Sequence, residues 1–232
     1  MGISLAIEGI DGSGKRTLSE KLKEKFESIG IESEIISFPR HQEEFSGELV
    51  DKFLYEGLRF NNDEYKEIRE GMLYAIDRMV SLGRIREDGK SKLDEYNENK
   101  LLIFDRYLSS NFIHRCNDMN EKELRTYINT MKYIEFKLLG LPEPDITLVL
   151  LVKPEVSYKN ILNRGRETDE NESLENLTKS YWNLMKLCEM EGYIPIDCCV
   201  KNKNGEYEML SREEILEKAW IALEIPENVK GE

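Results

Sequence analysis

The sequence lacks the marks of several large protein classes. It has two histidines and four cysteines, and no two cysteines stand at C-x-x-C spacing. This excludes the common zinc sites and favours reduced thiols. The longest apolar run, Ile146–Val152, is far too short to cross a membrane, and no signal peptide is evident around Ile3–Ile7. We therefore expect a cytoplasmic protein that is not attached to a membrane.

Positive charge is also scarce. The chain of 232 residues carries 33 basic and 46 acidic side chains, a net charge of -13. Such a surface repels a nucleic-acid polymer, so an anionic ligand must be small and must bind at a local basic cluster. The hydrophobic fraction of 40% is enough for a core, and no linker divides the sequence. A single domain over residues 1–232 is therefore expected.

Short apolar runs alternate with longer amphipathic stretches. The runs predicted as strands are Ser4–Ile7, Glu34–Phe38, Leu101–Phe104, Ile146–Val152 and Tyr193–Ile196. The stretches predicted as helices are Lys15–Ile29, Tyr65–Glu87, Glu121–Leu139, Glu155–Arg164, Asn176–Glu191 and Glu213–Leu223. This alternation predicts an α/β fold, a five-stranded parallel sheet flanked by helices on both faces. Ligands of such sheets bind at the carboxyl ends of the strands.

The residues after the first strand have the pattern of a P-loop. Residues 9–17 read G-x-x-x-x-G-K-x-T between a predicted strand and a predicted helix. Glycines let backbone N–H groups curl around phosphate oxygens, and the helix adds its positive N-terminal dipole. A nucleoside triphosphate is the expected ligand, and the residues expected at its phosphates are Gly9, Gly12, Ser13, Gly14, Lys15, Arg16 and Thr17.

Two residues of this loop depart from the usual motif. Arg16 stands where a Ser or Thr hydroxyl normally binds Mg²⁺, so the ion must be bound differently, or Thr17 or Asp11 must substitute. Asp11 places a carboxylate beside phosphates, which is repulsive unless it shares a metal ion or meets a substrate hydroxyl. Both features need an explanation in any functional interpretation.

Basic residues follow three later elements. Phe38-Pro39-Arg40-His41 comes after the second strand, and Asp105-Arg106 opens the segment Asp105–Asn111 after the third. Arg164 and Arg166 flank Gly165 at the end of a helix, where they could form a mobile lid near residues 164–172. Taken alone, the Asp–Arg pair could be a structural ion pair, and the two later arginines a solvated helix end.

Together these segments resemble the thymidylate kinase family, whose members phosphorylate dTMP to dTDP with ATP. The resemblance covers roughly residues 3–197 and includes Gly140–Asp145, which matches the family's G-L-P-x-P-D string. It implies a P-loop nucleoside-monophosphate-kinase fold, ATP as donor, Mg²⁺ as cofactor, a homodimer and a place in dTTP biosynthesis. Arg16 and Asp11 together resemble a subgroup of the family with Arg after the P-loop lysine.

The resemblance also implies roles for single residues. Lys15, Arg16 and the lid residue Arg164 would bind the donor phosphates, and Asp11 would meet the acceptor's 3′-hydroxyl region or Mg²⁺. The implied catalytic set is Lys15, Arg16, Arg106, Asp11 and Arg166. The implied dTMP-binding set is Asp11, Phe38, Pro39, Arg40, Tyr74, Arg78, Arg106, Ser110, Asn111 and His114.

Within that set the family pattern distinguishes contacts to the base from contacts to the sugar. Tyr74 would stack on thymine, Arg78 would bond O4, and Asn111, aided by Ser110, would reach N3. His114 replaces a tyrosine that lies under the deoxyribose, which leaves discrimination against ribonucleotides open. The lid acid also stays open, and the candidates are Glu167, Asp169 and Glu170. Residues 200–232 have no implied role, and Lys201–Glu206, with Asn-Gly inside it, is a hairpin or a loop insertion.

Three other interpretations remain. Another nucleoside or nucleoside-monophosphate kinase is one, although deoxynucleoside kinases carry E-R-S where this chain has Asp105-Arg106-Tyr107. A GTPase-like switch is the second, but no N/T-K-x-D motif follows the fifth predicted strand. A catalytically weak nucleotide-binding paralogue is the third, because Arg16 and the short lid depart from the family pattern.

Overall fold

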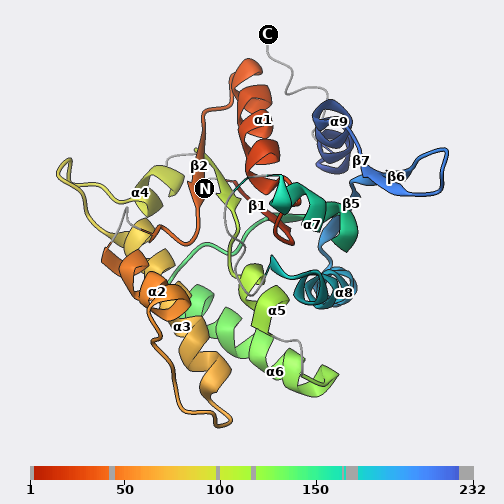
Figure 1. The fold of residues 1–232 in the computed structure, drawn as a ribbon. Coiled ribbons are helices and arrows are strands. Elements are labelled where there is room, and N and C mark those ends of the chain that lie inside the picture. The colour runs from red at the N-terminus through yellow and green to blue at the C-terminus, as the bar shows by residue number, and fades with distance from the viewer. Residues whose placement is uncertain are drawn as a thin grey trace.

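A parallel sheet forms the centre of the molecule. The computed structural model describes residues 3–41, 45–97, 100–115, 119–163, 165 and 172–224. Five strands run in the order β2-β3-β1-β4-β5, all paired in parallel. Figure 1 shows the sheet at the centre of the fold with helices around it. Their bounds are β1 (Ser4–Gly9), β2 (Ser33–Ser37), β3 (Leu101–Asp105), β4 (Ile146–Leu151) and β5 (Ile194–Asp197). The predicted five-stranded parallel sheet is therefore confirmed.

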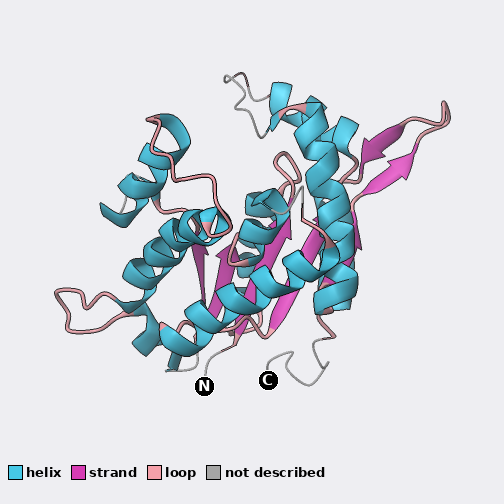
Figure 2. Ribbon diagram, turned by 90° about the horizontal axis from the view of Figure 1, so that it is seen from below, coloured by secondary structure: helices cyan, strands magenta, loops and turns pink. Residues whose placement is uncertain are grey.

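Helices cover the sheet, as the view from below shows (Figure 2). They are α1 (Lys15–Ser28), α2 (Phe45–Tyr55), α3 (Lys66–Gly83), α4 (Lys92–Asn97), α5 (Ser109–Arg115), α6 (Glu121–Lys132), the π-helix η2 (Tyr133–Leu138), α7 (Pro154–Leu162), α8 (Leu174–Glu191) and α9 (Arg212–Ala222). The short helices α2, α4 and α5 are not among the predicted elements. Within the described ranges, no helix is both long and apolar enough to cross a membrane.

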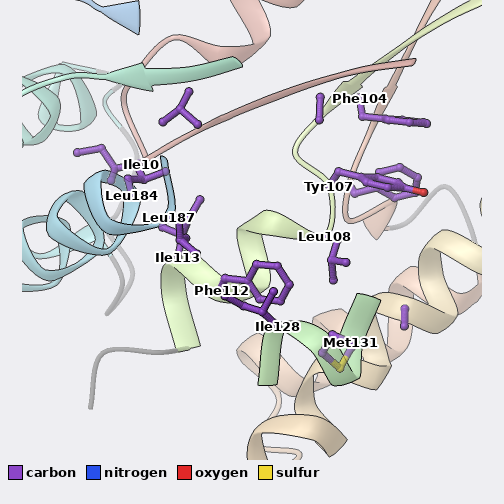
Figure 3. Packing of buried hydrophobic residues seen from close by; sticks show 14 of the residues in the cluster. Ile10, Phe104, Tyr107, Leu108, Phe112, Ile113, Ile128, Met131, Leu184 and Leu187 are labelled. Atoms are coloured by element: carbon purple, nitrogen blue, oxygen red, sulfur yellow. The ribbon is translucent and has the colours of Figure 1, made fainter. Parts of the chain in front are cut away.

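Alternate residues of each strand pack into one of two cores. Leu5 and Ile7 of β1 face a cluster that contains buried side chains of α1 and α9. Ala6 lies in the other cluster, together with buried residues of α3, α5, α6 and α8. Figure 3 shows this second core from close by, with Ile10, Tyr107 and Phe112 among its members. Both faces of the sheet are therefore dry, which is why the strands read as continuous apolar runs.

Two predicted helices differ from the structure. The predicted helix Glu121–Leu139 begins with a capping box of Asn120 and Glu123, but it changes to a π-helix at Tyr133. The predicted helix Tyr65–Glu87 ends at Gly83, because Arg84 is extended and the charged segment after it has no apolar face to bury. The π-helix contains Glu135, which accepts hydrogen bonds from the predicted site residue Arg78.

The region after β5 forms a hairpin of β6 (Cys199–Lys201) and β7 (Tyr207–Met209). It projects from the body of the molecule in both views (Figures 1 and 2). Asn160 of α7 connects the base of the hairpin to the P-loop. Its Nδ2 donates to the sulfur of Met209 at 3.2 Å and to the carbonyl oxygen of Gly12 at 3.0 Å. Of the two alternatives expected for Lys201–Glu206, a hairpin or a loop insertion, the antiparallel pairing of β6 and β7 confirms the hairpin.

Candidate phosphoryl-transfer site

The P-loop connects β1 to α1 at the carboxyl edge of the sheet. Gly12 has φ 79° and Gly14 has φ 87°, a region that favours glycine. A Cβ at Gly12 would also lie 2.5 Å from the carbonyl oxygen of Ser157, so α7 packs directly on the loop. The hydroxyl of Ser13 is buried and has no hydrogen-bond partner among the described residues. An orphaned hydroxyl in a cradle of backbone N–H groups fits an incoming phosphate.

Lys15 supplies the positive charge of this loop. Its Nζ donates to the carbonyl oxygens of Gly9 and Ile10, both at 2.9 Å, and an ammonium has a third N–H for a phosphate oxygen. Burial and then the charge of Arg106 lower the pKa of Lys15 to about 8. A bound polyphosphate would favour the charged form and raise that pKa again.

An ion pair joins the P-loop to the turn after β3. Arg106 donates from Nη2 to Oδ1 of Asp11, and both side chains are largely buried. Burial alone would raise the pKa of Asp11, but the charges of Arg106 and Lys15, with a smaller contribution from His114, outweigh it and hold that pKa well below its usual value. Asp11 is therefore ionised, and the predicted Asp11 and Arg106 lie together.

The turn after β2 faces the same edge of the sheet. The backbone N–H of Arg40 donates to Oδ2 of Asp77 at 2.8 Å, and the hydroxyl of Ser46 donates to Oδ1 of the same carboxylate at 3.0 Å. Asp77 on α3 thus fixes the backbone of the Phe38–His41 turn. Phe38 itself is buried, with its ring 5.8 Å from that of Tyr107.

Tyr74 and Arg78 lie one turn apart on α3, and they differ in exposure. Tyr74 is half-buried, whereas Arg78 is only 1% exposed. Nε and Nη2 of Arg78 donate to the two carboxylate oxygens of Glu135 at 2.7 and 2.6 Å. The guanidinium also lies 5.6 Å from the centre of the Tyr107 ring. Glu135 thus uses the N–H of Nε and one N–H of Nη2, which leaves both N–H groups of Nη1 and the second of Nη2 for a base.

Helix α5 contributes Ser110, Asn111 and His114. Asn111 is buried, and its Nδ2 has no acceptor among the described residues. A buried amide without a partner is costly, and it marks a place where a ligand acceptor fits. Ser110 is different, because its hydroxyl already donates to Glu8 at 2.6 Å. Of these two residues, Asn111 and not Ser110 therefore has a buried side-chain donor that a ligand could satisfy.

The remaining predicted residues are partly exposed at the start of α1 or lie outside the described part of the chain. The side chain of Arg16 is 83% exposed, and its Nε bonds Glu20 at 3.0 Å on α1. Thr17 is half-buried in the first turn of α1. The lid residues Arg164 and Arg166, and the candidate acids Glu167, Asp169 and Glu170, lie outside the described residues.

The carboxylates of the site fit a magnesium ion only in a limited way. Within the described residues, no group of three His, Cys, Asp or Glu side chains could hold a metal ion. Mg²⁺ usually binds one or two carboxylates and takes its other ligands from substrate phosphates and water. Asp11 and Asp105 fit that sparse donor set, because both carboxylates lie close enough to Lys15 that their charges act to raise its pKa.

Supporting residues of the site are missing from the sequence-based set. Glu8, Asp77, Glu135 and Asn160 each bond a site residue or the P-loop backbone. Only Glu8 gives a signal in the sequence, because it is a carboxylate inside an apolar run directly before the P-loop. Asp77 and Asn160 lie in ordinary amphipathic helices, and Glu135 lies in a stretch whose sequence reads like one, so a polar side chain there attracts no notice.

Comparison with known proteins decides between the remaining interpretations. The family model for thymidylate kinase matches residues 7–203, most of the chain. The chain belongs to the thymidylate kinase family. It is 29% identical to the thymidylate kinase of Mycobacterium tuberculosis over 167 residues, 70% of this chain and 71% of that one. It is 30% identical to the Leptospira interrogans thymidylate kinase over 178 residues, 76% and 77% of the two chains.

A solved structure shares the fold. The Candida albicans thymidylate kinase aligns with a TM-score of 0.66 and 20% identity over 96% of this chain and 91% of that one. The predicted P-loop nucleoside-monophosphate-kinase fold is thereby confirmed. Membership of the family makes the protein a nucleoside-monophosphate kinase and supports phosphorylation of dTMP. The alternatives of another nucleoside or nucleoside-monophosphate kinase, a switch protein or a weak paralogue are not favoured.

Proposed function

We propose that the protein transfers the terminal phosphate of ATP to dTMP, giving ADP and dTDP for dTTP biosynthesis. The observation that carries the proposal is the contact between the P-loop and the turn after β3, through Asp11 and Arg106. A donor held by the loop and an acceptor phosphate held by Arg106 would then meet at the carboxyl ends of β1 and β3. Two buried polar groups, Ser13 Oγ and Asn111 Nδ2, lack hydrogen-bond partners among the described residues. This supports one ligand at the P-loop and a second ligand at α5.

Phosphoryl transfer in this site needs charge and position more than proton transfer. The attacking group is a phosphate oxygen of dTMP, largely ionised at neutral pH, so no general base is required. Lys15 and Arg106 would neutralise the transferred group, joined by Arg166 or Arg164 from the lid. Mg²⁺ would be held by Asp11 and the phosphates of ATP, and when bound it supplies further positive charge. In this proposal Arg16 belongs to the family subgroup with Arg after the P-loop lysine, and it would turn from Glu20 to the donor phosphates.

Recognition of thymine would come from α3 and α5. Tyr74 would stack on the ring, Nη1 of Arg78 would donate to O4, and Asn111 would face N3. Phe38, Pro39 and Arg40 would close the acceptor side, and His114 would lie near the deoxyribose. The bidentate pair with Glu135 supports this proposal, because it holds the guanidinium in one orientation.

An acceptor panel tests the proposal. ADP release in a coupled assay is measured with dTMP, dUMP, dCMP and thymidine at equal concentration. The missing methyl of dUMP is worth about 1–3 kcal/mol in an apolar pocket, so its kcat/KM should be roughly 10- to 200-fold below that of dTMP. dCMP presents a donor to Arg78 and should be poorer still. Equal use of dCMP and dTMP would overturn the base-recognition proposal, and use of thymidine alone would indicate a nucleoside kinase.

We also propose a cytoplasmic homodimer. The described cysteines, Cys188, Cys198 and Cys199, are free thiols, which supports a reducing compartment. Phe45 and Leu49 of α2 expose apolar side chains that a second copy could cover. Light scattering on the purified protein tests this, and a monomer mass at micromolar concentration would contradict it.

A further inference from the structure

Glu8 is a carboxylate in the middle of an apolar layer. It is fully buried in β1, on the same face of the sheet as Ala6 and Ile10, and both of those belong to the core drawn in Figure 3. Burial raises the pKa of Glu8, against hydrogen bonds from Ser110 and Tyr107 and the charges of Arg106 and Lys15. A buried carboxylate of this kind is costly unless several donors converge on it. The packing of an ordinary strand would be served better by a Val or Ile.

Three donors do converge on Glu8, and all come from the turn that carries Arg106. The backbone N–H groups of Tyr107 and Ser110 donate to Oε1 at 2.8 and 3.1 Å. The hydroxyl of Ser110 donates to Oε2 at 2.6 Å. Both carboxylate oxygens are therefore used on a single turn, 99 to 102 positions further along the chain. Glu8 thus binds the backbone of residues 107–110 to the central strand.

The turn needs such support because Arg106 has an unfavourable backbone. Its φ is 67°, a left-handed conformation that costs a non-glycine residue about 1–2 kcal/mol. The N–H of Arg106 donates to the carbonyl oxygen of Ile7 at 3.1 Å, and the next N–H, of Tyr107, donates to Glu8. With these two bonds the chain reverses, and the guanidinium is directed at Asp11.

From this geometry we propose that Glu8 is a positioning residue for phosphoryl transfer. Its carboxylate holds the 106–110 turn so that the Arg106 guanidinium faces the P-loop, and it touches neither nucleotide. The inference rests on the proposed role of Arg106. This role requires that polar atoms at the end of the Glu8 side chain reach the N–H groups of Tyr107 and Ser110 and the Ser110 hydroxyl. It does not require that the side chain is negatively charged.

Three substitutions of Glu8 test whether the length of its side chain or its negative charge matters for turnover. Glu8→Gln keeps Oε1 for both backbone N–H groups, and its Nε2 can donate to the Ser110 hydroxyl, so kcat should stay within about 3-fold of the wild type. Glu8→Asp keeps the charge but is one methylene shorter, and Glu8→Ala removes both oxygens. Displacement of Arg106 by about 1 Å should lower kcat of both by roughly 10- to 100-fold. The KM for ATP should change by less than about 3-fold in all three, since the P-loop backbone is untouched.

A control variant on the same strand distinguishes displacement of Arg106 from a general loss of protein stability. Ser4 begins β1, at the end away from the P-loop, and its hydroxyl contacts Asp145 at 3.1 Å. Ser4→Ala should lower the melting temperature and leave kcat unchanged. Circular dichroism and thermal melts establish that each variant is folded before kinetics are compared. If Glu8→Ala does not fold, Glu8→Asp carries the test.

Coupling to Arg106 decides the proposal. In an Arg106→Ala background, Glu8→Asp or Glu8→Ala should lower kcat by less than about 2-fold further, because the group that it positions is gone. Additive losses in the double variant would overturn the proposal, as would a folded Glu8→Asp with wild-type kcat. A crystal structure of Glu8→Asp with Arg106 unmoved would overturn it as well. If Arg106→Ala alone retains full turnover, the proposed role of Arg106 fails first, and the role of Glu8 fails with it.

Discussion

The buried pair of Arg78 and Glu135 allows a quantitative prediction. Its side chains are 2% and 0% exposed, and two hydrogen bonds of 2.7 and 2.6 Å join them. Glu135→Leu would leave the guanidinium buried without its counter-ion, which costs about 3–5 kcal/mol. For a chain of this size, each kcal/mol lowers the melting temperature by roughly 2–4 °C, so a loss of about 6–20 °C is expected. Calorimetry or circular dichroism measures it.

Replacement of both partners tests the reasoning more sharply. Arg78→Met with Glu135→Leu fills the same space without a buried charge, and stability should return to within about 1 kcal/mol of the wild type. The double variant would still lack the proposed donor to thymine O4, a charged hydrogen bond worth about 1.5–3 kcal/mol. Its kcat/KM for dTMP should therefore fall roughly 10- to 150-fold while its melting temperature recovers.

An exposed pair provides the matched control. Glu121 and Arg125 on α6 are 2.9 Å apart, with side chains 62% and 54% exposed. Glu121→Leu should change stability by less than about 1 kcal/mol. A Glu135→Leu variant that melts no lower than this control would refute the reasoning about the buried pair. Recovery of dTMP kinetics together with stability would refute the proposed base contact.

Three further predictions concern the donor side. Because the pKa of Lys15 is about 8 and the protonated form binds phosphate, kcat/KM for ATP should fall as pH rises above about 8, and Lys15→Arg should remove that fall from the pH profile. On folding this pKa drops from 10.5, so the unfolded chain binds the proton more tightly between pH 8 and 10.5, and the free energy of unfolding should rise across that window. The methyl group of Met209 packs beside Gly14 of the P-loop, 3.3 Å from where a Cβ of that residue would lie. Met209→Ala removes this support for the ATP-binding loop, so it should raise the KM for ATP by up to about 10-fold, or ~1.4 kcal/mol, with little change in kcat. Loss of kcat instead would show that the hairpin acts on the chemical step.

The sheet could be predicted from sequence because its strands have a simple physical signature. Ile146–Val152 is apolar except for Thr147, since both faces of β4 are buried, and no helix of that length would be stable alone. The P-loop could be predicted because phosphate binding requires glycines and a lysine at set positions along one short segment. The short helices were missed for the opposite reason. The seven residues of α5 have no long apolar period, and the helix begins where Glu8 from β1 holds its first turn.

The supporting residues of the site could not be predicted in the same way. Each acts on a partner far along the chain, and one sequence gives no sign of such pairs. Asp77 bonds the backbone of Arg40, 37 positions earlier, and Arg78 bonds Glu135, 57 positions later. The π-helix that contains Glu135 has no recognisable residue pattern of its own, and Ile134–Phe136 reads like any amphipathic helix.

The central claim is that the P-loop and the turn at Arg106 form one site for direct phosphoryl transfer. The most direct test follows the terminal phosphate of ATP, labelled with ³²P, in the presence of dTMP. The account predicts that the label enters dTDP and not inorganic phosphate, and that a folded Arg106→Ala variant transfers it about 10²- to 10³-fold more slowly. Label in inorganic phosphate, or transfer by Arg106→Ala at the wild-type rate, would contradict it.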